Sequence, residues 1–97
     1  MSAPSNKVKG DRFEATVAHA LEDLGEVCFR VRQGQGEPVD LVSISPGGSV
    51  RFVQVKSGKR GPYLLPAERE GLVEKAKACR ATAWVAWKDG TVRMKAL

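Results

Sequence analysis

The sequence predicts an α/β fold in which helices flank one central, mixed five-stranded sheet, in the order α-β-β-β-α-β-β. Three observations lead to this expectation: apolar residues recur at helical spacing in two stretches, strand-like runs occur in five, and turn-forming residues separate them. With 97 residues the chain has room for one compact domain and not for two. We therefore expect residues 1–8 to form a flexible tail and residues 9–97 a single domain.

The first helix is expected from about Gly10 to Leu24, and Gly25 should end it. Its apolar side chains recur at helical spacing, which places them on one buried face. They are Phe13, Val17, Ala20, Leu21 and Leu24. Glu14 lies at the margin of this face. It is either an ordinary boundary residue of an amphipathic helix or a carboxylate held against the sheet.

A first strand is expected at Val27–Arg32, where apolar residues alternate with Cys28, Arg30 and Arg32. The alternation gives this strand one basic face. Residues 33–38 should then form a loop with two glycines, which allow close approach of the backbone to a ligand. Two isolated glycines do not make a phosphate-binding fingerprint.

Two strands joined by a hairpin turn follow, at Leu41–Ile44 and Val50–Lys56. The intervening Ser-Pro-Gly-Gly-Ser consists of turn formers. Because side chains alternate along a strand, Gln54 and Lys56 share one face, and Asp40 at the entrance of the first strand can converge with them. The alternative is that Asp40 is a turn residue and Lys56 a solvated residue near a strand end.

The second helix should begin at Pro66, a residue suited to the first helical position. Its glutamates near the start and its basic residues near the end match the helix dipole. Two more strands are expected at residues 82–88 and 91–96, because Asp89-Gly90 between two alternating runs is a strong hairpin signal.

The net charge of +5 at pH 7 favours a polyanionic partner. Three pairs of basic residues adjoin the candidate site residues, and we interpret them as phosphate contacts, with solvated surface charge as the alternative for any single pair. The pairs are Lys9 and Arg12, Arg30 and Arg32, and Lys59 and Arg60.

The composition also bears on the cellular compartment. No apolar stretch approaches the roughly 20 residues of a membrane span, and the first residues lack the apolar core of a signal peptide. Cys28 and Cys79 lack the spacing of a metal-binding knuckle, so we expect buried free thiols, with a disulfide as the alternative. These features predict a cytoplasmic protein without a membrane partner.

The motifs and their order resemble the PD-(D/E)xK nuclease superfamily and, within it, the archaeal-type Holliday junction resolvases. The similarity covers residues 9–88, nearly the whole domain. It rests on four segments in the family's order: Lys9-Gly10-x-Arg12-Phe13-Glu14, Arg30-x-Arg32 before a glycine-containing loop, Val39-Asp40-Leu41-Val42, and Val53-Gln54-Val55-Lys56-Ser57. Three features depart from the family. Pro38 stands one residue further from the acid, and the glycine loop has Gln33 and Gln35 where the family commonly carries a Ser. Gln54 stands where a carboxylate is expected, although Mrr-like restriction branches also carry Gln-x-Lys.

The resemblance implies a restriction-endonuclease-like core and a metal-dependent endonuclease that resolves four-way (Holliday) junctions in DNA by paired nicks. Carried over to this chain, it makes Glu14, Asp40, Gln54 and Lys56 the catalytic residues. Mg²⁺, for which Mn²⁺ would substitute, would be held by Asp40, Gln54 and the backbone carbonyl of Val55, with Glu14 binding directly or through water. The basic pairs would bind the DNA, and a homodimer would match the approximate two-fold symmetry of a four-way junction.

Two other functions stay open at the level of the sequence. A restriction- or repair-type nuclease of the Mrr-like branch would act on other DNA, and a catalytically silent DNA-binding module would have lost its metal site through Gln54. Retention of the other three catalytic residues argues against the silent module. Trp84 and Trp87 are candidates for a dimer interface or for the core of the monomer.

Overall fold

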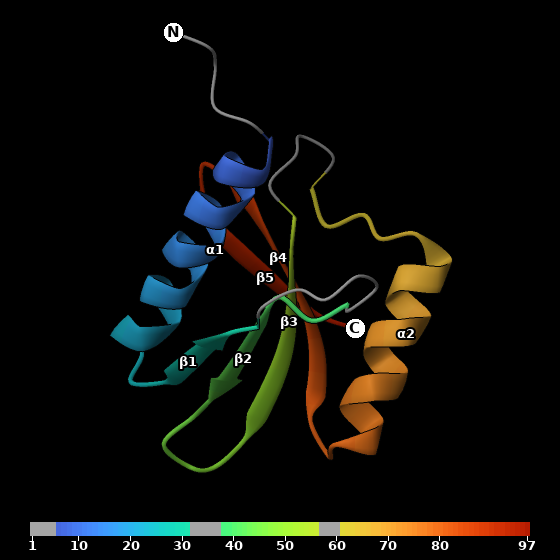
Figure 1. The fold of residues 1–97 in the computed structure, drawn as a ribbon. Coiled ribbons are helices and arrows are strands. Elements are labelled where there is room, and N and C mark those ends of the chain that lie inside the picture. Colours follow the sequence, from blue (N-terminus) through green and yellow to red (C-terminus); the bar gives the residue numbers. More distant parts are fainter. Residues whose placement is uncertain (1–5, 32–37, 57–60) are drawn as a thin grey trace, which may run out of the picture.

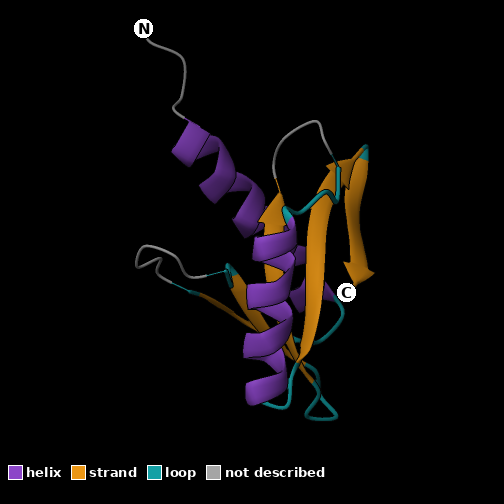
Figure 2. Ribbon diagram, turned by 90° about the vertical axis from the view of Figure 1, so that its right-hand side faces the viewer, coloured by secondary structure: helices purple, strands orange, loops and turns teal. Residues whose placement is uncertain are grey.

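The structure, a computed structural model, describes residues 6–31, 38–56 and 61–97, with side chains from residue 12 onward in the first helix. One five-stranded sheet has a helix packed against each face (Figures 1 and 2). The elements follow the predicted order. They are α1 Asn6–Asp23, β1 Val27–Arg30, β2 Leu41–Ile44, β3 Val50–Lys56, α2 Pro66–Ala78, β4 Thr82–Asp89 and β5 Thr91–Ala96.

The strands are ordered β1-β2-β3-β4-β5 across the sheet. The first three pair antiparallel, whereas β3 and β4 pair in parallel because α2 carries the chain back between them. An antiparallel hairpin joins β4 to β5 and turns at Gly90, whose φ of +72° suits glycine. The predicted mixed sheet is therefore confirmed.

The face of the sheet under α1 holds the larger core cluster. Side chains of α1 pack there against β2, β3 and β4, and removal of this apolar surface from water stabilises the helix on the sheet. The buried members are Phe13, Val17, Ala18, Leu21, Leu41, Val53 and Ala86. Gly25, with a φ of +88°, ends α1 as predicted, and the Glu26 N–H donates to the Leu21 carbonyl at 3.2 Å.

On the opposite face, α2 covers β3 and β4. Leu72 and Ala76 are buried there with Ala83 of β4. Because Val53 faces α1, strand alternation turns the residues on either side of it toward α2. This places Gln54, and with it Lys56, on the α2 face of the sheet.

The start of α1 and the exposure of Leu24 differ from the expectation. α1 begins at Asn6 rather than Gly10, so residues 6–8, expected in a flexible tail, are helical, and no Pro or Gly between residues 6 and 9 opposes this. Leu24 is 72% exposed, because it follows the helix and helical spacing no longer directs it inward. In the described ranges neither α1 nor α2 combines the length and apolar character that a bilayer crossing requires.

Two further expectations concern β1 and the cysteines. β1 ends at Arg30, and Arg32 lies outside the described residues. Both cysteines are free, as predicted. Cys28 is half-buried, but Cys79 is exposed rather than buried, because it is the C-cap residue of α2 and no longer on the helix face that contacts the sheet.

Leu41→Ala should lower the free energy of unfolding by about 2–5 kcal/mol, because Leu41 is fully buried under α1 and truncation leaves a cavity. Leu24→Ala is the control, and its effect should stay within about 0.5 kcal/mol because Leu24 is exposed. Urea denaturation followed by circular dichroism measures both. Equal losses would contradict the assigned core.

Candidate active site

The candidate site is built around Asp40, a buried residue directly before β2. Its N–H donates to the Val53 carbonyl at 2.9 Å, and its Oδ2 accepts the Val55 N–H at 2.7 Å. Asp40 thus extends the hydrogen bonding between β2 and β3 by one residue before the start of β2, and it lies across from Gln54. The structure thereby brings Asp40 to the strand segment with which the sequence grouped it.

Gln54 and Lys56 meet a residue that the sequence did not assign to the site, Glu68 of α2. Nε2 of Gln54 donates to Oε2 of Glu68 at 2.9 Å, and Nζ of Lys56 donates to the same oxygen at 2.7 Å. The Lys56 and Glu68 side chains are 28% and 30% exposed, so this ion pair is only partly shielded from water.

Glu68 also caps the amino-terminal end of its own helix. Its Oε1 accepts the N–H of Leu65, the N-cap residue, at 3.3 Å. The hydrogen bond from Lys56 is the main reason that the pKa of Glu68 is lowered, and the Leu65 and Gln54 donors lower it further against the effect of burial. At neutral pH Glu68 is therefore ionised and can only accept hydrogen bonds.

The side-chain oxygen of Gln54 takes no part in these hydrogen bonds. Its Oε1 is buried and has no hydrogen-bond partner within the described part of the chain. An unpaired buried acceptor costs about 1–3 kcal/mol, so such an atom marks a place where a ligand, ion or water binds.

Asp40 and Gln54 together offer a carboxylate and an amide oxygen, the hard donors that Mg²⁺ or Mn²⁺ prefers. The unpaired Gln54 oxygen fits such a use. Among the side chains that the structure describes, those of residues 12–31, 38–56 and 61–97, no three of His, Cys, Asp or Glu converge as a metal-binding group. A cation here would therefore depend on the amide, on backbone oxygens and on water as well as on Asp40.

Glu14 lies on α1, which covers the face of the sheet opposite to Gln54 and Lys56. Its Oε2 forms an ion pair with Nη2 of Arg30 on β1, at 3.0 Å. Among the described residues, this is the contact that the structure gives Glu14, rather than one with Asp40, Gln54 or Lys56. The structure thus joins two residues for which the sequence suggested separate roles, a metal-site acid and a phosphate contact.

Two of the six predicted DNA-contacting side chains are described, and both Arg12 and Arg30 are exposed. They belong to α1 and β1, which pack together. Outside the described residues lie the side chain of Lys9 and all of Arg32, Lys59 and Arg60.

A second buried polar network lies toward the other end of β2. Ser43 donates to Glu26 at 2.6 Å and accepts from Cys28 at 3.6 Å, while Arg51 lies 3.6 Å from Glu26 and 4.6 Å from the ring centroid of Trp84. Burial raises the pKa of the Cys28 thiol, against the opposing hydrogen bond with Ser43, so Cys28 is no thiolate nucleophile. We assign this network a structural role, and Trp84 packs on the α1-side core.

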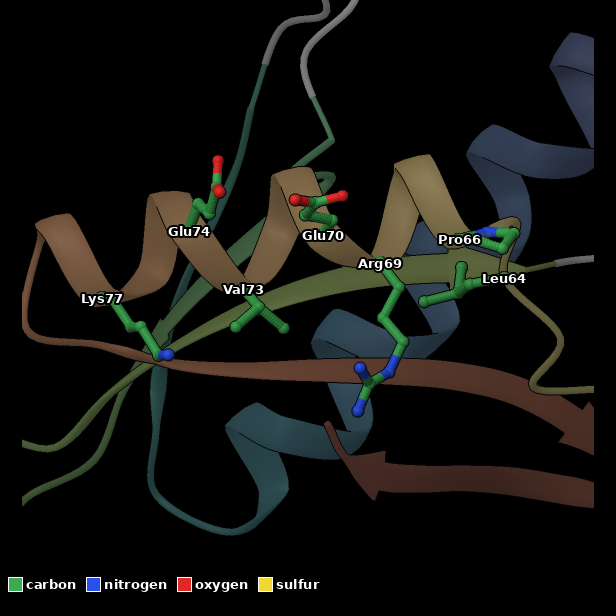
Figure 3. A pocket seen from close by; sticks show the side chains of 7 residues that line it. All are labelled: Leu64, Pro66, Arg69, Glu70, Val73, Glu74 and Lys77. Carbon is green, nitrogen blue, oxygen red and sulfur yellow. The ribbon is translucent and has the colours of Figure 1, made fainter.

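An open hollow of about 520 Å³ runs along α2 (Figure 3). Side chains of α2 and of the segment just before it line the hollow: Leu64, Pro66, Arg69, Glu70, Val73, Glu74 and Lys77. None of the predicted site residues lines it, so the hollow is separate from the group around Asp40.

The chain is similar to proteins that act on branched DNA. The model of the archaeal Holliday junction resolvase (Hjc) family matches residues 5–97. Among solved structures, that of Archaeoglobus fulgidus Hjc, a Holliday junction resolvase from an archaeal hyperthermophile, is similar with a TM-score of 0.75 and 30% sequence identity. The similarity covers 88% of this chain and 73% of that one. No curated protein matches the sequence.

Glu68→Gln should lower the free energy of unfolding at neutral pH by less than about 1 kcal/mol, because a partly exposed ion pair contributes little. The folded state lowers the pKa of Glu68, so its contribution is complete above the ordinary value of 4.5 and is lost as the pH falls through the folded-state pKa. Urea denaturation of wild type and variant at about pH 7 and about pH 3 should show the difference shrinking on acidification. A difference that grows would contradict this account.

Proposed function

Because this chain belongs to the archaeal Holliday junction resolvase family, we propose that it cleaves four-way DNA junctions with a divalent-metal site at the carboxyl end of β3. The family match spans residues 5–97 and so includes every proposed site residue. The observation that supports this site most directly is the buried oxygen of Gln54, which has no hydrogen-bond partner among the described residues and lies across the hairpin from the buried Asp40.

In this proposal Asp40 and Gln54 hold Mg²⁺, or Mn²⁺ in its place. The backbone carbonyl of Val55 is a further ligand, and Glu14 contributes directly or through water. When bound, the cation supplies positive charge that stabilises the phosphate in the transition state. Because the amide of Gln54 is neutral, the site holds its cation more weakly than a site with another carboxylate, and DNA and cation bind together.

Lys56 acts at the attacked phosphate. Its ammonium, held at 2.7 Å by Glu68, can orient the attacking water and stabilise negative charge on the phosphate. The ion pair between Glu14 and Arg30 opens when DNA binds, because a phosphate competes with Glu14 for the guanidinium. Release from Arg30 frees the Glu14 carboxylate on the α1 side of the sheet, from which its contribution in this proposal runs through water.

A homodimer follows from the proposed substrate. A four-way junction has approximate two-fold symmetry, and resolution by paired nicks needs one active site on each of two strands. A symmetric pair of this chain supplies both.

Labelled four-way junction, linear duplex and single-stranded DNA, each with Mg²⁺ and with a chelator, test the proposed function. A resolvase makes paired nicks in the junction alone, and only with the metal. Equal cleavage of linear duplex would instead support a nuclease of the Mrr-like type. Junction binding without cleavage in Mg²⁺ or Mn²⁺ would indicate a silent binding module.

Asp40→Asn should abolish junction cleavage and leave junction affinity unchanged or slightly higher, because the substitution removes a negative charge that faces phosphate. Asp89→Asn is the matched control, since it removes the same charge at the exposed end of β4. Gel assays of binding and cleavage measure both effects. Near-normal cleavage by Asp40→Asn would remove Asp40 from the site.

Junction affinity should fall steeply with salt, with a log–log slope of about −5 if about six phosphates are neutralised. Replacing Arg30 and Arg32 together by Ala should reduce the magnitude of that slope by about 1 to 2. Arg93→Ala, an exposed arginine on β5 at the opposite edge of the sheet, is the control. Fluorescence anisotropy across a salt series gives the slopes, and identical slopes for all three proteins would place the DNA elsewhere.

A further inference from the structure

Glu68 is not among the catalytic residues that the sequence predicted, yet it contacts two of them. Its Oε2 accepts from Nε2 of Gln54 at 2.9 Å and from Nζ of Lys56 at 2.7 Å. The two donors are alternate residues of β3, whereas Glu68 comes from the first turn of α2. One carboxylate oxygen therefore sets how the helix start and the strand end meet.

This carboxylate decides which way the Gln54 amide is turned. An ionised carboxylate accepts hydrogen bonds and donates none, so the amide must present its nitrogen to Glu68. The reverse orientation would set the amide oxygen against a carboxylate oxygen. The oxygen of the amide is therefore turned away from Glu68, and it is the buried atom without a partner in the described residues.

Lys56 is restrained by the same oxygen. A lysine side chain has four rotatable methylene groups, and its ammonium would otherwise sample many positions. The charged hydrogen bond to Glu68 is short, and Glu68 is itself anchored at the helix start through the N–H of Leu65. The contact thus fixes the ammonium of Lys56 beside the amide of Gln54.

We propose that Glu68 is a positioning residue for cleavage, which orients the Gln54 oxygen toward the metal site and holds the Lys56 ammonium next to it. The inference rests on the proposed function, because it needs Gln54 as a metal ligand and Lys56 as the group that acts at the phosphate. In this account Glu68 acts through its neighbours: its Oε1 accepts from Leu65, and its Oε2 accepts from the two β3 side chains.

The first test compares Glu68→Gln with Glu70→Gln, which removes the same charge from an exposed position of the same helix. Glutamine at position 68 can still accept the Leu65 N–H, but it lacks the negative charge that holds Lys56. It can also present either its amide oxygen or its NH₂ group to Gln54, so it no longer fixes the orientation of the Gln54 amide. At saturating protein, Glu68→Gln should cleave about 10-fold more slowly and need about 10-fold more Mg²⁺ for half-maximal rate. Glu70→Gln should stay within about two-fold of wild type on both measures.

The second test exchanges the two groups. Gln54→Glu alone adds a charge that favours the cation but sets two carboxylates against each other, so it should keep some cleavage at a rate below that of wild type. Gln54→Glu combined with Glu68→Gln restores a hydrogen bond between an amide and a carboxylate, with the donor now on the helix. The double variant should cleave about 10-fold faster than Gln54→Glu alone, whereas a merely structural Glu68 predicts that the two losses add. This variant stays informative even if Glu68→Gln unfolds, because it keeps both chemical groups at the contact.

A third readout needs neither metal nor DNA. In the metal-free protein, the side-chain NH₂ of Gln54 should give a slowly exchanging ¹H–¹⁵N signal in wild type and in Glu70→Gln, and this signal should be lost in Glu68→Gln. An unchanged signal together with an unchanged Mg²⁺ requirement in Glu68→Gln would overturn the proposal. Wild-type cleavage and Mg²⁺ requirement in Gln54→Leu would instead refute Gln54 as a ligand, and thus the proposed site itself, whatever the NMR signal shows.

Discussion

The site depends on one hydrogen bond, from the backbone N–H of Val55 to the buried carboxylate of Asp40. A buried carboxylate persists only where donors satisfy it, and here the neighbouring strand supplies a donor whose position is fixed by its own pairing with β4. The paired strands of the sheet therefore fix the position of the Asp40 carboxylate. A slip of one residue in the β2–β3 register would turn Gln54 and Lys56 to the α1 face and separate all three groups.

Much of the fold could be predicted because it follows from local patterns. Alternation along β3 places Gln54 and Lys56 on one face, and the Ser-Pro-Gly-Gly-Ser turn sets them near Asp40. The wrong predictions concern the ends of the helices, because the periodicity of apolar residues does not show where a helix begins or ends. Asn6 begins α1 earlier than expected, and Leu24 lies past its end, because apolar spacing describes a helix face and not its limits.

The contacts between helices and strands could not be predicted in the same way. Glutamate in the first turn of a helix is favoured by the helix dipole whatever lies beside it, so Glu68 gave no sign of its contact with Gln54 and Lys56. Likewise, no local pattern states that α1 packs beside β1, and this packing joins Glu14 to Arg30. In both cases the missing information is the tertiary placement of a helix.

The parallel pairing of β3 with β4 divides the contacts of the candidate site into local ones, within the β2–β3 hairpin, and non-local ones, made through α2. Hairpins form in about 1–10 μs, and β2 and β3 are joined by a short turn, so Asp40 and Val55 can meet early. Glu68 reaches Gln54 only when α2 has folded back onto the sheet, before or together with the non-local β3–β4 pairing. This step costs more loop-closure entropy than closing the β2–β3 hairpin, because the loop is longer. A chain that has formed only the meander of β1 to β3 would therefore hold Asp40 beside Val55 but lack the contacts of Glu68 with Gln54 and Lys56, so the proposed site is complete only when the β3–α2–β4 unit has formed.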